Sequence, residues 1–313
     1  MTQTAGTPCL GLEDFANLFG TTADALPAPC RALVAAHDFG YRVLDDAEHA
    51  ALLARVNARV DAGEFSVAGR EGKGRWERGW GENLAAFRAE DDVEALVPRY
   101  IRDGQPLRLF RRFVVPTDPR FERRWYAVFR RWLFATRFAD VGAVWEFGCG
   151  SAHNLAELAT LFPGLPLVGL DWSVAACDLV NELARRRGWR AEGRLFDFFA
   201  PDESLVLPPY AAVLTVGALE QTGRDWGPFL DWLLRRRPRR VVHVEPILEW
   251  YDADDPVDLA AIRFHRARRY WSGFPERLRA LAAAGRVEIL RTKRAYFGSL
   301  YLEGYSQLEW RPL

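Results

Sequence analysis

The segment 144–154 places a glycine-rich turn between an apolar strand and a helix. The strand ends close to Glu146, and glycines follow at Gly148 and Gly150. Glycine allows a tight turn and lets the backbone approach a ligand closely. Because the first turn of the following helix also has unpaired N–H groups, the segment predicts a cradle for a nucleotide-sized ligand in an α/β protein.

An acidic residue, Asp171, ends the next predicted strand. It follows the glycines by about 20 residues, which is where nucleotide-binding βαβ units place the acceptor for a ribose hydroxyl. A dinucleotide fingerprint would have a third glycine where this chain has His153. That departure disfavours a pyrophosphate site, but an NAD(P)-dependent Rossmann oxidoreductase stays open as an alternative.

These motifs resemble those of the class I S-adenosylmethionine-dependent methyltransferases. The first motif of that family, acid-x-Gly-x-Gly, is matched by Glu146, Gly148 and Gly150. Its second-strand acid, which holds the ribose, is matched by Asp171, with Trp172 beside it. The resemblance therefore implies S-adenosylmethionine as the cofactor and these five residues as part of its binding site.

Later segments follow in the order expected of the same family. A third strand is predicted to end within 194–199, where the resemblance implies that Asp197 contacts the adenine amino group beside Phe198. Further strands are predicted over the ranges 211–217, 241–245, 286–292 and 300–310. The resemblance covers roughly 120–313. It implies a seven-stranded, mostly parallel Rossmann-like methyltransferase sheet with an antiparallel terminal strand.

The organisation of the chain is predicted from its helices and breakers. Helices are expected over the ranges 120–134, 174–187, 227–236 and 256–271. Residues 1–120 are expected to form a mainly helical N-terminal extension with a proline-punctuated connection after residue 98, and residues 121–313 the methyltransferase domain. With 313 residues, one catalytic domain plus an extension is the natural interpretation.

The glycine-rich segment 69–84 has two tryptophans, Trp76 and Trp80, and admits two interpretations. Flexible linkers rarely contain tryptophan, so the segment could form an ordered lid that folds over the cofactor cleft and excludes water. Alternatively, the two indoles, four residues apart, pack one helical turn onto the core. The sequence does not separate these interpretations.

Composition narrows the classes of partner. The formal net charge is zero, which gives no reason to expect a nucleic-acid partner. Arginines at 185–187 and 235–237 fall at predicted helix ends and are interpreted as solvated helix surface. We expect no signal peptide and no membrane span. We also expect no metal site, because the four cysteines lack metal-ligand spacing. A cytoplasmic location is expected, and the oligomeric state is open.

Candidate catalytic residues are those expected at the carboxyl edge of the sheet, where open α/β folds bind ligands. Methyl transfer to oxygen or nitrogen can require a base within hydrogen-bond reach of the acceptor. Glu220 after the fourth strand, Glu245 at the end of the fifth and His265 on the helix 256–271 qualify. Glu245 could instead cap a loop, His265 could be helix surface, and His243 is predicted to be a core histidine.

The sequence thus predicts an enzyme that methylates oxygen or nitrogen of a small-molecule or sugar-like biosynthetic intermediate. The fourth-strand loop begins Gly217-Ala218-Leu219-Glu220 and lacks the Asn/Asp-Pro-Pro-Tyr signature of amino-group methyltransferases that act on nucleic acids or glutamine. Two alternatives stay open: the NAD(P)-dependent oxidoreductase and a non-catalytic nucleotide-binding module that has kept the fold.

Overall fold

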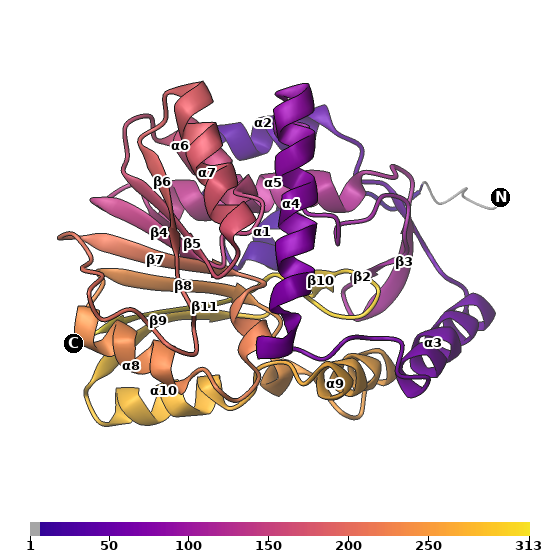
Figure 1. The fold of residues 1–313 in the computed structure, drawn as a ribbon. Helices are drawn as coiled ribbons and strands as arrows, with labels where there is room; N and C mark the ends of the chain where they lie inside the picture. Colours follow the sequence, from indigo (N-terminus) through magenta and orange to yellow (C-terminus); the bar gives the residue numbers. More distant parts are fainter. Residues whose placement is uncertain (1–6) are drawn as a thin grey trace.

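A central seven-stranded sheet organises the molecule, which the computed structural model describes over residues 7–313 (Figure 1). The strand order is β6-β5-β4-β7-β8-β11-β9. The strands are β4 (Ala143–Phe147), β5 (Leu167–Asp171), β6 (Ala191–Leu195), β7 (Ala211–Val216), β8 (Arg240–Glu245), β9 (Val287–Lys293) and β11 (Ser306–Pro312). Only β11, the last strand of the chain, runs antiparallel to its neighbours β8 and β9. The predicted fold class is confirmed.

Both faces of the central strands β4, β5 and β7 are buried, which explains why these strands read as continuous apolar runs. Alternate side chains of β4 point to opposite faces, as the pleat requires. Ala143, Trp145 and Phe147 join one apolar cluster, whereas Val144 joins the other. The strand that leads into the glycine turn is therefore fixed on both sides.

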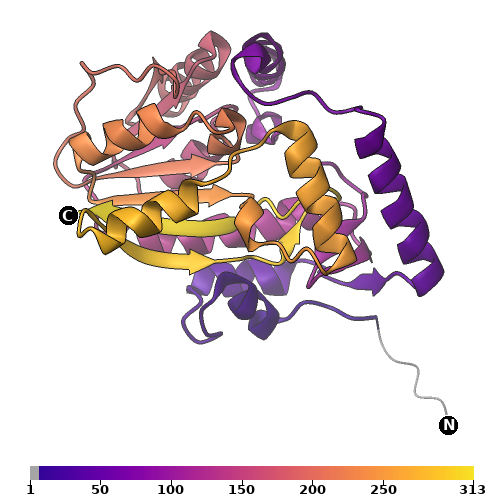
Figure 2. The same ribbon diagram turned by 90° about the horizontal axis from the view of Figure 1, so that it is seen from below.

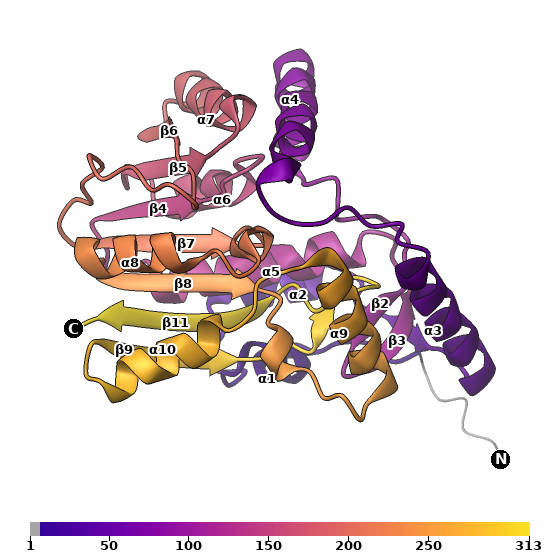
Figure 3. The same ribbon diagram turned by 60° about the horizontal axis from the view of Figure 1, so that its bottom comes forward.

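Two layers of helices supply these clusters. One face packs against α5 (Phe121–Arg137), α6 (His153–Leu161) and α7 (Val174–Arg187), and the other against α8 (Gly227–Arg236) and α10 (Phe274–Ala283). Figure 2 shows the orange α8 and the gold α10 across the near face of the sheet. Helix α9 (Pro256–Arg268) lies beyond the carboxyl edge of β8 (Figure 3). The ends of α7 and α8 coincide with the predicted ones, and α9 ends three residues earlier than predicted.

The N-terminal region contributes helices and a second, smaller sheet. Its helices are α1 (Leu12–Phe19), α2 (Ala28–Ala36), α3 (Asp46–Asp61) and α4 (Lys73–Glu90). The small sheet has the order β1-β3-β2-β10 and consists of β1 (Tyr41–Val43), β2 (Leu107–Leu109), β3 (Arg112–Pro116) and β10 (Phe297–Gly298). The segment predicted as an extended connection thus contains two paired strands.

Residues 7–120 are not detached from the rest. The ring of Phe19 stacks on Trp132 of α5 at a centroid distance of 4.9 Å and meets Trp125 edge-on at 5.6 Å. Helix α3 packs against α9, and strand β10 adds a C-terminal edge to the N-terminal sheet. The predicted boundary at residue 120 falls between β3 and α5, inside one continuous core.

Short 3-10 turns complete the secondary structure. They cover Arg70–Gly72, Val93–Leu96, Leu219–Thr222 and Leu248–Trp250. Within residues 7–313, none of the helices combines the length and the apolar character needed to cross a lipid bilayer.

Candidate active site

Two adjoining cavities lie where the carboxyl ends of β4, β5, β6 and β7 meet. The aromatic cavity has a wall that includes Trp172, Phe196, Phe198, Phe199, Gln221 and Thr222. The turn cavity has a wall that includes Tyr100, Tyr126, Glu146, Gly150, His153 and Asn154. Both are also lined by Trp76, Trp80, Gly148 and Gly217. They are therefore two compartments of one cleft.

The predicted glycine turn separates the two compartments. Gly148 and Gly150 both have positive φ, at 74° and 50°, which side chains rarely adopt. The Gly148 N–H donates to the Leu170 carbonyl oxygen at 2.6 Å, which ties the turn to β5. A Cβ added at Gly148 would lie 2.3 Å from Cβ of Ala218, and one at Gly150 would lie 2.7 Å from Cζ2 of Trp80. The two glycines are thus required by conformation and by space.

Glu146 presents an unpaired carboxylate oxygen in the turn cavity. Its Oε1 accepts a hydrogen bond from Nδ2 of Asn154 at 2.7 Å, and Oδ1 of Asn154 accepts one from the Tyr126 hydroxyl at 2.7 Å. Oε2 of Glu146 is buried and has no partner. Burial raises the pKa of this carboxyl to about 8, against the hydrogen bond from Asn154. A buried acceptor without a partner is a place where a ligand donor would be stabilised.

Asp171 lies at the end of β5 and lines the aromatic cavity. Its two oxygens accept the N–H groups of Gly150 at 3.0 Å and Ser173 at 2.9 Å. Burial raises the pKa of the carboxyl to about 6, although both backbone donors act in the opposite direction. Asp171 therefore joins the glycine turn to the start of α7 while one edge of its carboxylate faces the cleft.

The other predicted cofactor residues are not all placed alike. Trp172 and Phe198 line the aromatic cavity, as an apolar wall for a flat ring would require. Asp197 is not among the residues that line either cavity, and its Oδ1 accepts the Phe199 N–H at 2.8 Å. The contact of Asp197 with an adenine stays a prediction.

The glycine-rich segment is a helix that covers the cleft. Trp76 and Trp80 lie one turn apart on α4, and their indoles stack at a centroid distance of 5.4 Å and an interplanar angle of 19°. Glu77 accepts the N–H groups of Val174 and Ala175 at 2.9 Å and 3.0 Å, so α4 caps the N-terminus of α7. The segment combines features of both interpretations, because the two tryptophans lie one helical turn apart and their side chains line the cleft.

Glu245 anchors the loop that follows β7. It is fully buried, and its carboxylate accepts N–H groups of Ala218 at 3.1 Å, Leu219 at 3.0 Å and Glu220 at 3.3 Å. Burial raises its pKa against these donors. The carboxylate lines neither cavity. This geometry corresponds to the loop-capping alternative, and a role of Glu245 as the base stays a prediction.

The predicted core histidine supports the same loop. Trp310 Nε1 donates to Nε2 of His243 at 3.1 Å. The ring proton of neutral His243 is therefore on Nδ1, which donates to the Thr215 hydroxyl oxygen at 2.9 Å. Thr215 in turn bonds to the Glu245 carboxylate and lowers its pKa. Burial lowers the pKa of His243 to about 3, which keeps it neutral. His243 is a paired core residue, as predicted.

Glu220 lies next to the aromatic cavity. Its Oε1 accepts a hydrogen bond from Nε2 of Gln221 at 2.7 Å, and Gln221 lines the cavity. Burial and the nearby charge of Glu245 raise the pKa of Glu220, so this carboxyl holds a proton more tightly than an exposed one. Glu220 lines neither cavity itself, but of the two predicted carboxylate bases it has the fewer internal donors and bonds a residue of the cleft wall.

His265 is not helix surface, which corrects that alternative. Its ring is 1% exposed, lies between the rings of Tyr251 and Tyr270, and has no hydrogen-bond partner on either nitrogen. Burial lowers its pKa to about 3. It lines neither cavity, so its catalytic role stays a prediction.

Sequence reasoning missed several residues of the cleft, among them Asn154 and Tyr126. Asn154 stands two residues after Ala152, in the first turn of α6, and that position relative to Glu146 was a usable signal. Tyr126 comes from α5, and nothing local in the sequence marks it. In the described part of the chain, no cluster of three or more His, Cys, Asp or Glu side chains could hold a metal ion.

The buried carboxyl groups predict an unusual dependence of stability on pH. Burial raises the pKa values of Glu122, Glu146 and Asp171 to about 7, 8 and 6, above those of the unfolded chain. The contribution of these protonated groups to the free energy of unfolding is fully present below about pH 4 and is lost as the pH rises through their pKa values in the folded protein. Each tenfold difference in proton affinity between the folded and the unfolded chain corresponds to about 1.4 kcal/mol. We expect the free energy of unfolding in urea to fall between about pH 6.5 and pH 8, above the range in which the buried neutral His243 and His265 add stability with rising pH. The Glu146→Gln variant should show a shallower decline, and a wild-type stability that rises over this range would contradict the assignment.

Comparisons with known proteins give a fold-level likeness. No protein-family model and no curated protein matches the chain. Among solved structures, it is similar to magnesium protoporphyrin IX methyltransferase ChlM from Synechocystis PCC 6803 with bound SAM (15% identity, 59% of this chain and 76% of that chain, TM-score 0.41). Mitomycin 7-O-methyltransferase MmcR (16%, 92% and 76%, 0.42) and the (4+2)-cyclase SpnF (17%, 60% and 82%, 0.44) are similar to it as well. What the protein does must be argued from its own cleft.

Proposed function

We propose that the protein is an S-adenosylmethionine-dependent methyltransferase that acts on oxygen or nitrogen of a small-molecule acceptor. The observation that carries the proposal is the unpaired buried oxygen of Glu146, which shares a cleft with the glycine turn and Asp171. Together they form a site with two buried carboxylates and close backbone access.

The residues of the cleft fit this cofactor. Oε2 of Glu146 would accept a hydrogen bond from the ammonium group, and the turn from Gly148 to Gly150 would let the chain approach its middle. Asp171 would hold the ribose hydroxyls, and Phe198 offers an apolar wall for the adenine. A positively charged group beside Glu146 would lower the pKa that burial has raised and so favour the carboxylate form.

The glycine turn argues against NAD(P). The dinucleotide fingerprint has a third glycine where this chain has His153, which disfavours close approach of a pyrophosphate to the start of α6. A pyrophosphate above the turn would also leave Oε2 of Glu146 without a hydrogen-bond donor.

When bound, S-adenosylmethionine supplies an electrophilic methyl group on a sulfonium. What the chain contributes is alignment of the acceptor with that group, exclusion of water and removal of a proton. Trp76 and Trp80 line the cleft, and the loop held by Glu245 carries Gln221 to its wall, with Glu220 bonded to Gln221 behind it. We assign Glu220 as the group that takes the acceptor proton, with Glu245 as a positioning residue.

Replacing Glu220 with glutamine is expected to lower kcat by about a hundredfold, because a positioned base contributes on that order. The wild-type rate should rise with pH as the carboxyl, whose pKa is raised by burial, loses its proton, and the variant should lose that rise. Transfer of a labelled methyl group at several pH values measures both. Asp225→Asn, an exposed change just after the same turn, is the control. An unchanged pH profile in Glu220→Gln would remove Glu220 from catalysis.

Calorimetric titration tests the proposed function directly. S-adenosylhomocysteine should bind, NADH should not, and the intrinsic fluorescence should change because Trp76 and Trp80 line the cleft. Labelled methyl transfer to a member of a small-molecule library would then establish catalysis. Binding of NADH alone would favour the oxidoreductase. Cofactor binding with no acceptor in the library would favour a non-catalytic module.

A further inference from the structure

Two arginines near the cleft, Arg75 of α4 and Arg268 at the end of α9, have guanidinium groups without an acidic or carbonyl partner. Nη2 of Arg75 and Nε of Arg268 are buried and make no hydrogen bond. The one hydrogen bond of the Arg268 side chain is a long one, 3.4 Å to the Ser66 hydroxyl. Buried donors of this kind are costly unless a ligand or water completes them.

This state sets the pair apart from the other arginines. Five more have a buried nitrogen without a partner, but each of them also bonds a carboxylate or a backbone carbonyl: Arg108, Arg123, Arg130, Arg236 and Arg240. The arginines at 185–187 and 235–236 pair with Glu182, Asp91 or Glu203, as expected of solvated helix ends. Within residues 7–313, the combination of a buried unpaired nitrogen and no such acceptor is confined to Arg75 and Arg268.

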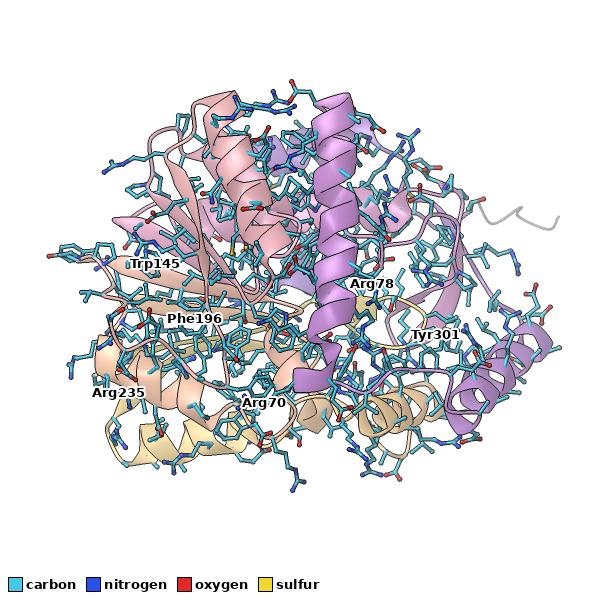
Figure 4. All side chains as sticks on the ribbon, viewed as in Figure 1. Arg70, Arg78, Trp145, Phe196, Arg235 and Tyr301 are labelled. Carbon is cyan, nitrogen blue, oxygen red and sulfur yellow. The ribbon has the colours of Figure 1, made fainter. Side chains whose placement is uncertain are left out.

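The two guanidinium groups lie behind the cleft wall, beside Trp76 and Tyr270 respectively. The Arg75 guanidinium carbon lies 5.5 Å from the ring centroid of Trp76, which lines both cavities. The Arg268 guanidinium carbon lies 4.9 Å from the ring centroid of Tyr270. The Ala68 N–H donates to the Arg268 carbonyl oxygen at 2.8 Å, which joins the chain ahead of α4 to the end of α9. Figure 4 labels Arg70 and Arg78, which bracket Arg75 at this end of α4.

The charges around the pair are mostly positive. Burial, then the charges of Arg268 and Arg78, lower the pKa of Arg75, so these cations lie within electrostatic reach of one another. The acid Glu220 lies within reach of Arg268, which lowers its pKa, but burial and the charge of Glu245 raise the pKa of Glu220 more strongly. The guanidinium carbons lie over the rings of Trp76 and Tyr270, and Nη2 of Arg75 and Nε of Arg268 make no hydrogen bond.

We propose that Arg75 and Arg268 bind an anionic group, a carboxylate or a phosphate, on the acceptor substrate. Guanidinium groups present forked donors that match both anions, and a charge-assisted contact in a partly buried place is stronger than one in water. That the anionic group belongs to the acceptor substrate rests on the proposed function, but the anion site itself does not. It narrows the substrate to a small, flat or apolar molecule with one acidic group.

Binding of two simple probes, inorganic phosphate and benzoate, tests the site by calorimetry without any methyl transfer. Arg75→Gln and Arg268→Gln should each weaken binding of the preferred probe by about tenfold or more. Arg88→Gln on α4 and Arg266→Gln on α9, both exposed, are matched controls and should stay within about twofold. Urea unfolding checks that each variant folds. Arg75→Lys and Arg268→Lys keep the positive charge and lose the forked N–H donors, and they replace a glutamine variant that does not fold.

The outcomes separate this inference from the proposed function. Tighter binding of phosphate points to a phosphorylated acceptor and tighter binding of benzoate to a carboxylic acid; either supports the site. Failure of both probes to bind the wild type, or equal binding in the glutamine variants, overturns it. A tenfold loss of S-adenosylhomocysteine affinity in Arg75→Gln or Arg268→Gln would assign the pair to the carboxylate of the cofactor and also overturns it. If the wild type does not bind S-adenosylhomocysteine, the proposed function is refuted but the anion site is not.

Discussion

Replacing Asp171 with alanine is expected to weaken binding of S-adenosylhomocysteine by about ten- to a hundredfold, about 1–3 kcal/mol. The variant loses the acceptor for the ribose hydroxyls. It also leaves the N–H groups of Gly150 and Ser173 without their carboxylate partner in a buried turn. Cofactor affinity and fold stability should therefore fall together. Calorimetric titration and urea unfolding measure the two effects on the same samples.

The pH dependence separates the binding role of Asp171 from its structural role. Because burial raises its pKa to about 6, cofactor affinity of the wild type should decrease as the pH falls through that value. Asp171→Asn should keep much of the stability and lose this dependence. Asp178→Asn, an exposed change on α7, is the control and should behave as the wild type. If Asp171→Ala folds and binds the cofactor within twofold of the wild type, the cofactor does not lie where we place it.

Replacing Arg294 with methionine is expected to lower the free energy of unfolding by about 3–5 kcal/mol. Its guanidinium bonds Asp258 of α9 at 2.6 Å, Glu303 at 2.6 Å and the Trp250 carbonyl oxygen at 2.8 Å, and all three ionic side chains are buried. Removing the cation strands two carboxylates in the interior. Urea unfolding at pH 7 measures the loss.

Two further variants decide whether the loss comes from uncompensated charge. Adding Glu303→Gln to Arg294→Met should recover part of the stability, because one of the stranded carboxylates is then neutral. Arg279→Met removes an exposed pair with Glu276 on α10 and should change stability by less than about 0.5 kcal/mol. A loss below about 1 kcal/mol in Arg294→Met would show that the cluster is not what holds α9 to the C-terminal loop.

The sheet and its flanking helices could be predicted because their signals are local. Ser173 accepts the Ala176 N–H as an N-cap, and Gly188 ends α7 in a left-handed conformation, as the sequence indicated. Continuous apolar runs such as β7 reflect burial on both faces. The glycine turn and Asp171 lie together because the carboxyl ends of parallel strands share one edge.

The helix α4 was ambiguous because its stability is not intrinsic. It contains Gly74, Gly79 and Gly81, each unfavourable in a helix by about 1 kcal/mol relative to alanine. Packing against α7 and the bonds from Glu77 to the start of α7 compensate, and neither contact can be read from the segment itself. Tertiary contacts override propensity here.

The parts of the site that escaped prediction depend on distant partners. Tyr126 reaches the cleft only because α5 packs beside α6, and the end of α9 meets the segment ahead of α4 through the bond from the Ala68 N–H to the Arg268 carbonyl oxygen. The small sheet was missed for the same reason: β2 pairs with β10, from the far end of the chain. Sequence spacing gives no information about contacts between segments that are far apart in the chain.

The pairing of Leu109 with Phe297 has a consequence for biosynthesis. While the ribosome is still translating the middle of the chain, the edge of β2 has no strand to cover it, and the nascent polypeptide exposes open backbone donors and acceptors. Such edges invite association with other chains. Closure has to wait until the final segment emerges from the exit tunnel, so a holding chaperone would be most useful during that interval.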